Sequence, residues 1–166
     1  MRPAAVSAVA TLLLTLGACG TVPVNIGESE QQVIAKLGNP THRYQDGNDR
    51  LLEYMQGPWG QATYMARIGP DGKLISYEQA LAADKFAKIK IGESRKEDVL
   101  RTIGAPSETS YLSLPKLEVW SYPYRESNVW DSVMHVHFDD AGTVRQMMNA
   151  PDRRRTPGMG GFMGRM

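Results

Sequence analysis

An internal repeat is the feature that most constrains how this chain can fold. Ile-Gly-Glu-Ser occurs at residues 26–29 and again at 91–94. In both places a pair of adjacent apolar residues follows, and then an apolar residue, a glycine and, two positions after the glycine, a proline. The pattern predicts two tandem copies of one small unit. Such units bury little surface alone, so the copies hold either two small cores or one shared core.

Each copy is predicted to begin with a short helix. Ser29 with Gln32, and Ser94 with Glu97, match the capping box that satisfies free N–H groups at a helix start. A glycine able to adopt a left-handed conformation ends each helix, and the following proline prevents its resumption. The apolar residues that would face the core are Val33, Ile34 and Leu37 in the first copy, and Val99, Leu100 and Ile103 in the second.

After each helix the apolar period changes to alternation, which predicts four strands per copy. The joining segment 79–90 is alanine-rich and is expected to form a short helix with Ala82, Phe86 and Ile89 on one face. The fold class is therefore α+β, two tandem repeats of short helices packed on a small antiparallel sheet. The expected strands are 41–45, 50–55, 62–68 and 73–78, then 107–112, 117–122, 133–138 and 143–148.

The amino-terminal residues 1–18 have the features of a secretory signal: Arg2, an apolar run too short to span a bilayer, and small residues before Cys19. Leu16-Gly17-Ala18-Cys19 resembles the bacterial lipobox, which implies cleavage before Cys19 and covalent lipid on it. Several acyl chains hold a protein on a membrane almost permanently. Gly20 stands where inner-membrane retention signals usually place Asp, so the periplasmic face of the outer membrane is expected.

The mature chain is expected to divide into four parts: a tether at 19–25, the repeats at 26–82 and 83–150, and a tail at 151–166. The tail is rich in Gly, Arg and Met, has no periodic apolar pattern and is expected to be disordered. Its Arg153, Arg154 and Arg155 are either solvated or in contact with anionic lipid headgroups. The body that precedes the tail carries a net negative charge, which argues against nucleic acid as a partner.

The repeated pattern and the lipobox together resemble the BamE family of lipoproteins, also called SmpA/OmlA, over about residues 16–150. The resemblance rests on these residues: Gly27, Ser29, Val33, Leu37-Gly38 and Pro40, then Gly92, Ser94, Val99, Ile103-Gly104 and Pro106, with the strand pair Trp120 and Tyr122. It implies two helices on a three-stranded sheet and a non-catalytic accessory role in assembling outer-membrane β-barrel proteins. The tandem arrangement is closer to the secreted β-lactamase inhibitor proteins, so the alternative is an inhibitor of a periplasmic enzyme.

Large aromatic residues in expected loops are the first candidates for a partner-binding surface. Trp59 and, in the second copy, Tyr124 and Trp130 lie in equivalent stretches between the second and third strands. Aromatic residues are common interface anchors, although these rings could also fold back over a sheet edge. An exposed tryptophan would favour partner binding.

Enzyme and metal sites have little support in the sequence. His135 and His137 share one strand face near Asp139, but two imidazoles do not make a metal site. No sequence signature of a nucleophile, a zinc protease or a phosphate-binding loop occurs. We therefore expect a binding protein with no catalytic residue, no metal and no cofactor other than the lipid on Cys19. The remaining alternative, a periplasmic ligand-binding or catalytic domain, would require a closed pocket.

Overall fold

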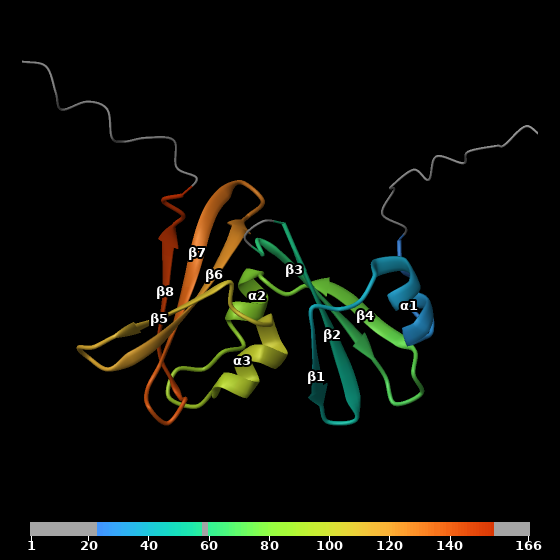
Figure 1. The fold of residues 1–166 in the computed structure, drawn as a ribbon, viewed down its shortest axis with the longest axis horizontal. Helices are drawn as coiled ribbons and strands as arrows, with labels where there is room; N and C mark the ends of the chain where they lie inside the picture. The colour runs from blue at the N-terminus through green and yellow to red at the C-terminus, as the bar shows by residue number, and fades with distance from the viewer. Residues whose placement is uncertain (1–22, 58–59, 155–166) are drawn as a thin grey trace, which may run out of the picture.

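Each repeat forms a four-stranded antiparallel sheet with its strands in sequential order, as the computed structural model of residues 23–57 and 60–154 shows (Figure 1). The first unit contains α1 (Glu30–Leu37), β1 (His42–Asp46), β2 (Asp49–Gln56), β3 (Ala62–Ile68) and β4 (Leu74–Gln79). The second contains α2 (Ala83–Phe86), α3 (Lys96–Ile103), β5 (Glu108–Leu112), β6 (Leu117–Glu126), β7 (Trp130–Phe138) and β8 (Val144–Pro151). The predicted α+β class with two tandem units is confirmed at this level.

The sheets have four strands, as the alternation predicts, and not the three that the family resemblance implies. One predicted boundary is wrong. The stretch between Tyr122 and Val133 is expected to be a loop, but β6 and β7 continue through it and Tyr124 pairs with Ser132. Ser127 and Asn128, both at positive φ, close this hairpin in a tight turn.

The two main helices begin differently. At α1 the predicted capping box is confirmed, because the Gln32 N–H donates to Ser29 Oγ and the Ser29 N–H donates to Gln32 Oε1. At α3 the predicted Ser94 cap is wrong. The second copy has one extra residue before its valine, so the helix begins one residue later and the Arg95 N–H donates to the Asp98 carboxylate at 2.8 Å. This shift keeps Val99 fully buried.

Each unit has its own core on one face of its sheet. The first comprises Val33, Leu52, Tyr54, Ala66, Ile68 and Leu74, packed under α1. The second comprises Leu81, Phe86, Ile89, Val99, Ile103, Trp120, Tyr122, Tyr124, Val136, Phe138 and Val144, packed under α2 and α3. The joining segment supplies buried residues to this core, although its helix is a single turn. Within the described residues the two units therefore do not share one core, and a third, smaller cluster of Leu51, Met65 and Ala80 lies on the other face of the first sheet.

The units are joined on the opposite face of the first sheet, through Glu53. This side chain is 0 % exposed and accepts hydrogen bonds from Tyr44 Oη at 2.6 Å and from the Ala105 N–H at 3.1 Å. Ala105 belongs to the turn that ends α3. In the same turn, the carbonyl of Gly104 accepts a hydrogen bond from Tyr122 Oη of the second sheet, at 3.2 Å. A buried carboxylate thus ties the first sheet to the helix of the second unit.

The close approach at this joint depends on Gly104. Gly104 and Gly38 end equivalent helices, and each has a φ of 85° with an extended ψ. The positive φ agrees with prediction, although the extended ψ places neither residue in the left-handed helical conformation. A Cβ at Gly104 would lie 2.5 Å from Glu53 Oε1, whereas one at Gly38 would meet nothing within 4 Å.

We predict that Gly104→Ala destabilises the protein more than Gly38→Ala. Both variants place a side chain at a positive φ with an extended ψ, a conformation adopted almost only by glycine, at a cost of about 1–3 kcal/mol. Only Gly104→Ala also displaces the Glu53 carboxylate, which should add about 1–3 kcal/mol. Urea unfolding followed by circular dichroism measures both. Equal losses would mean that the Glu53 contact does not constrain the joint.

Candidate functional site

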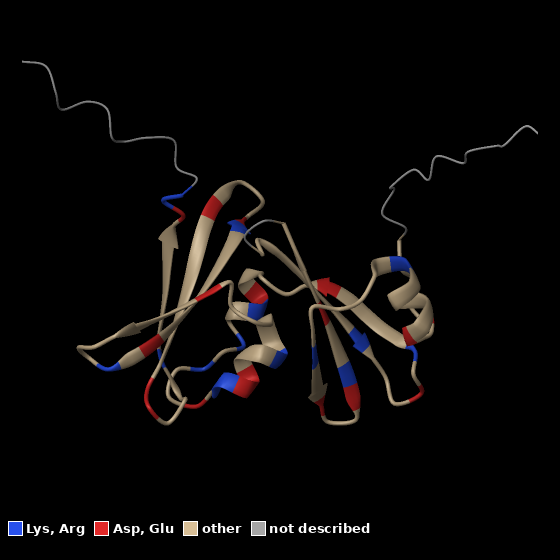
Figure 2. Ribbon diagram, in the orientation of Figure 1, with Lys and Arg blue, Asp and Glu red and all other residues tan. Residues whose placement is uncertain are grey.

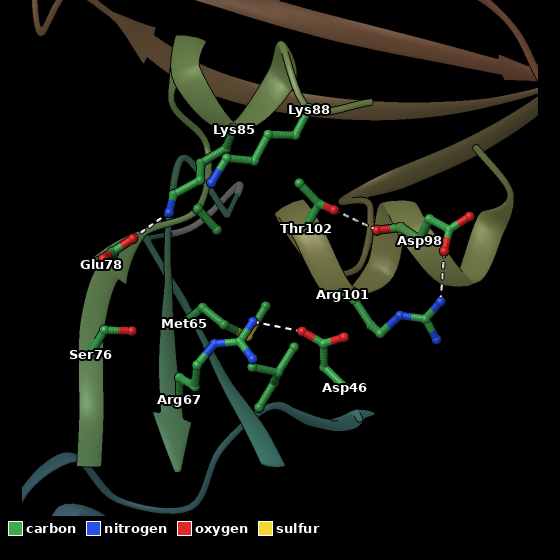
Figure 3. A pocket seen from close by; sticks show the side chains of 12 residues that line it. Asp46, Met65, Arg67, Ser76, Glu78, Lys85, Lys88, Asp98, Arg101 and Thr102 are labelled. Atoms are coloured by element: carbon green, nitrogen blue, oxygen red, sulfur yellow. Dashed lines mark hydrogen bonds and ion pairs between the residues drawn. The ribbon is translucent and has the colours of Figure 1, made fainter. Parts of the chain in front are cut away.

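A cleft of about 310 Å³ lies between the first sheet and the helices of the second unit (Figure 3). Its floor is apolar: Leu51, Met65 and Ala80 are 1 %, 9 % and 2 % exposed and form a small cluster of their own. Leu51 and Met65 reach this face because alternate residues of a strand point to opposite faces of its sheet. The charged and polar lining residues are Asp46, Arg67, Ser76, Glu78, Lys85, Lys88, Asp98, Arg101 and Thr102.

Charged groups of both signs gather on the elements around this cleft (Figure 2). Arg67 donates to Asp49 at 2.8 Å and to Asp46 at 2.7 Å. Burial acts to lower the pKa of Arg67, but these two hydrogen bonds outweigh it and raise the pKa above its usual value. The guanidinium is therefore a fixed positive charge shared by two carboxylates.

Two further ion pairs lie on the helical side of the cleft. Lys85 pairs with Glu78 across the cleft, joining α2 to β4. Arg101 pairs with Asp98 at 2.6 Å within α3. The Arg95 N–H and then the Arg101 guanidinium lower the pKa of Asp98, so this carboxylate is ionised at neutral pH. The lining comes from both repeats, and sequence patterns within one repeat do not reveal it.

The second sheet presents a different surface on its corresponding outer face. Strand register places Ser121 where the first sheet has Glu53, and His135 where it has Met65. No helix within residues 23–57 and 60–154 packs on this face, whereas α3 lies over the equivalent face of the first sheet (Figure 1). Two equivalent sheet faces thus have different roles, one joining the units and one without a helical cover.

His135 and His137 lie side by side on this outer face, as their alternation predicts. Ser121 Oγ is 2.9 Å from His135 Nδ1, and His137 is 7 % exposed. Burial lowers the pKa of both imidazoles. Asp139 instead caps the following turn and pairs with Arg145 at 2.7 Å. Among the described residues no group of three or more metal-ligating side chains comes together.

The aromatic candidates are placed differently from one another. Trp130 begins β7 and is 70 % exposed. Tyr124 is 5 % exposed and packs edge-on against Phe86, with ring centroids 4.9 Å apart. The prediction of Tyr124 as a contact residue is therefore wrong, because the strand continues and turns this ring into the core. Trp59 lies outside the described residues.

The basic residues at the end of β8 are only partly described. Arg153 is exposed. Arg154 is also exposed, but it pairs with Asp152 at 3.0 Å and lies 3.9 Å from Glu108 on β5. Arg155, the rest of the tail, the signal segment and Cys19 lie outside the described residues. None of the described helices is long and apolar enough to cross a membrane.

Comparisons of this chain with protein-family models, curated proteins and solved structures find no match. Arguments about function therefore rest on the residues and their geometry.

We predict that the free energy of unfolding falls as the pH drops from 7.5 to 5. Burial lowers the folded-state pKa of His135 and His137 below the unfolded value of about 6.5, so the unfolded chain takes up protons first. A His135→Gln/His137→Gln variant should show a smaller fall, measured by urea unfolding at each pH. Asp98 and Glu118, whose pKa values are lowered, lose their contributions only at more acidic pH. An unchanged pH dependence in the double variant would contradict this assignment.

Proposed function

We propose that this chain is a non-catalytic lipoprotein of the outer membrane that binds protein partners on its periplasmic side. The lipobox at Cys19 supports the anchor, and the resemblance of both repeats to the BamE family supports a role in assembling outer-membrane β-barrel proteins. The protein would act by position: the lipid holds it at the membrane, and the second unit presents a contact surface.

The observation that carries this proposal is the exposed β6–β7 hairpin of the second sheet, where Trp130 is 70 % exposed and the adjacent Val129 is 62 % exposed. Single exposed apolar residues are normal on any protein, but an exposed tryptophan beside a second exposed apolar side chain is typical of an interface anchor. Of the nine exposed large apolar side chains within residues 23–57 and 60–154, six belong to this sheet and its hairpins. They are Tyr111, Leu112 and Leu114 around the β5–β6 hairpin, Val129 and Trp130 at the β6–β7 hairpin at the other end of β6, and Met148 on β8.

The first unit provides a precedent for covering the outer face of such a sheet. There, the turn that ends α3 docks on β2, and its Ala105 N–H donates to Glu53, which is 0 % exposed. On the equivalent face of the second sheet, Val119, Ser121 and Val133 are only 5–8 % exposed and Arg125 pairs with Asp131. Leu112 and Met148 remain exposed there. A partner that lays a helix or a hairpin on this face would repeat a contact that the chain already makes internally.

Inhibition of a periplasmic enzyme is the second candidate. It is supported by the tandem arrangement, which resembles that of the β-lactamase inhibitor proteins, and by the same exposed Trp130. The two functions differ in the partner, since an inhibitor binds one soluble enzyme in a fixed stoichiometry. Partner identification therefore separates them.

The anchor predicts that Cys19→Ala moves the protein from the membrane fraction to the soluble periplasm. Without the thiol no acyl chain can be attached at residue 19, so the expected lipid anchor is lost. Fractionation and mass spectrometry of the amino-terminal peptide measure this change. Trp130→Ala serves as the control and should remain in the membrane fraction. Membrane retention of Cys19→Ala would rule out lipid on Cys19 as the anchor.

The contact surface predicts that Trp130→Ala loses a partner that the wild type retains. A central aromatic anchor contributes about 2 kcal/mol or more, equivalent to roughly 30-fold in affinity. Affinity purification from membranes in mild detergent should recover barrel-assembly components with the wild type and much less with Trp130→Ala. Ile75→Ala, which truncates an exposed apolar residue of the first sheet, is the matched control.

The same purification distinguishes the alternatives. Recovery of a single soluble periplasmic enzyme would favour the inhibitor. Equal recovery of partners by wild type and Trp130→Ala would show that the hairpin of the second unit is not the contact surface.

A further inference from the structure

The cleft between the units combines an apolar floor with charged ends. Leu51, Met65 and Ala80 are buried within the protein yet line a space that is open to solvent. Only three of the twelve lining residues are apolar, so the cleft is more polar than a typical ligand pocket, and its volume of about 310 Å³ is at the small end of the usual range. The floor therefore suits a short apolar chain or a single side chain.

The end of the cleft near α2 carries an unbalanced positive charge. Lys85 lies on α2 and Lys88 two residues beyond its end, and Figure 3 shows both ammonium groups extending into the cleft. Glu78 pairs with Lys85. Lys88 makes no ion pair with any residue in the part of the chain that the structure describes. One ammonium group here is thus available for an anion.

The end of the cleft near the β1–β2 hairpin has the opposite balance. Arg67 is held between Asp46 and Asp49, so this group carries a net negative charge. Arg101 is balanced by Asp98 on the same helix. A second carboxylate on a ligand would be repelled at this end, whereas a neutral end would not.

From this charge layout we infer that the cleft binds a monocarboxylate with an apolar stem. The carboxylate pairs with Lys88, and the stem lies on Leu51, Met65 and Ala80 toward the Arg67 end. A short alkanoate and the carboxyl-terminal apolar residue of a peptide share this chemistry. The site is separate from the Trp130 hairpin and does not depend on the proposed protein partner.

The test uses the processed, lipidated chain in nanodiscs, labelled with ¹³C on the methionine methyl groups. Met65 lies in the floor, and its signal is assigned through Met65→Leu. Hexanoate should shift this signal in a saturable way. Acetate lacks the stem and 1-hexanol lacks the charge, so each should bind at least about fivefold more weakly. Adipate, with a second carboxylate, should also bind more weakly than hexanoate.

The Lys88 side chain is tested by three variants. Lys88→Gln should weaken hexanoate binding about fivefold, as expected for a partly exposed ion pair, and Lys88→Arg should keep it within about twofold. Lys73→Gln is the matched control, an exposed lysine outside the cleft, and should bind as the wild type does. An unchanged Met65 signal in ligand-free Lys88→Gln verifies that the fold is retained.

A peptide separates the two sources of carboxylate. If peptide ends enter the cleft, Ala-Ala-Leu with a free carboxyl terminus should bind and its carboxyl-terminal amide should not. If hexanoate binds and neither peptide does, the site belongs to small carboxylates. The inference is overturned if hexanoate at about 20 mM leaves the Met65 signal unchanged, a concentration that detects even very weak binding. It is also overturned if 1-hexanol binds as well as hexanoate, or if Lys88→Gln binds hexanoate as the wild type does.

Discussion

The buried carboxylate of Glu53 is the interaction on which the arrangement of the two units depends. Removing a carboxylate from water is costly unless hydrogen bonds replace its hydration. Here Tyr44 and the Ala105 N–H supply them, and His42 Nδ1 lies 3.1 Å away. Burial and the hydrogen bond to Glu53 raise the pKa of Tyr44, so its phenol remains a donor. Because one donor comes from each unit, Glu53 sets the position of α3 on the first sheet.

That position also creates the cleft. The floor belongs to the first sheet, while Lys85, Lys88 and Arg101 belong to the second unit, so the site exists only when the units are docked. A change at the Glu53 joint would move one wall of the cleft relative to the other. Stability of the joint and geometry of the cleft are therefore linked through the turn at Gly104.

The repeats have the same topology but differ in the residues of their outer faces. Glu53 and Arg67 in the first sheet correspond to Ser121 and His137 in the second. Charged groups on the first outer face hold the neighbouring unit and line a cleft. The second outer face has no covering helix among the described residues, although Val119 and His137 on it are only 5 % and 7 % exposed.

Local patterns predicted much of the fold but little of the site. Strand positions agree with the alternation to within a few residues, except where β6 and β7 extend toward Ser127, because alternation reports which face a residue takes and only weakly where pairing stops. The cap at Ser29 is a contact between near neighbours in the sequence, so it was predictable. At α3 the predicted cap at Ser94 was wrong, because the burial of Val99 decided where the helix begins. Tyr124 was misassigned for the same reason, since its expected loop is a paired strand.

The sequence by itself determined the repeat, the α+β class, the outward face shared by His135 and His137, and the resemblance of residues 16–19 to a lipobox, because each is encoded over a few adjacent residues. The tertiary structure alone decided that Glu53 is buried, that Gly104 needs to be glycine for close approach, and that Lys88 shares a cleft with Met65. These depend on how one unit packs against the other. Such packing brings residues that are tens of positions apart in the sequence to within a few ångströms of each other, and no short-range sequence pattern indicates it.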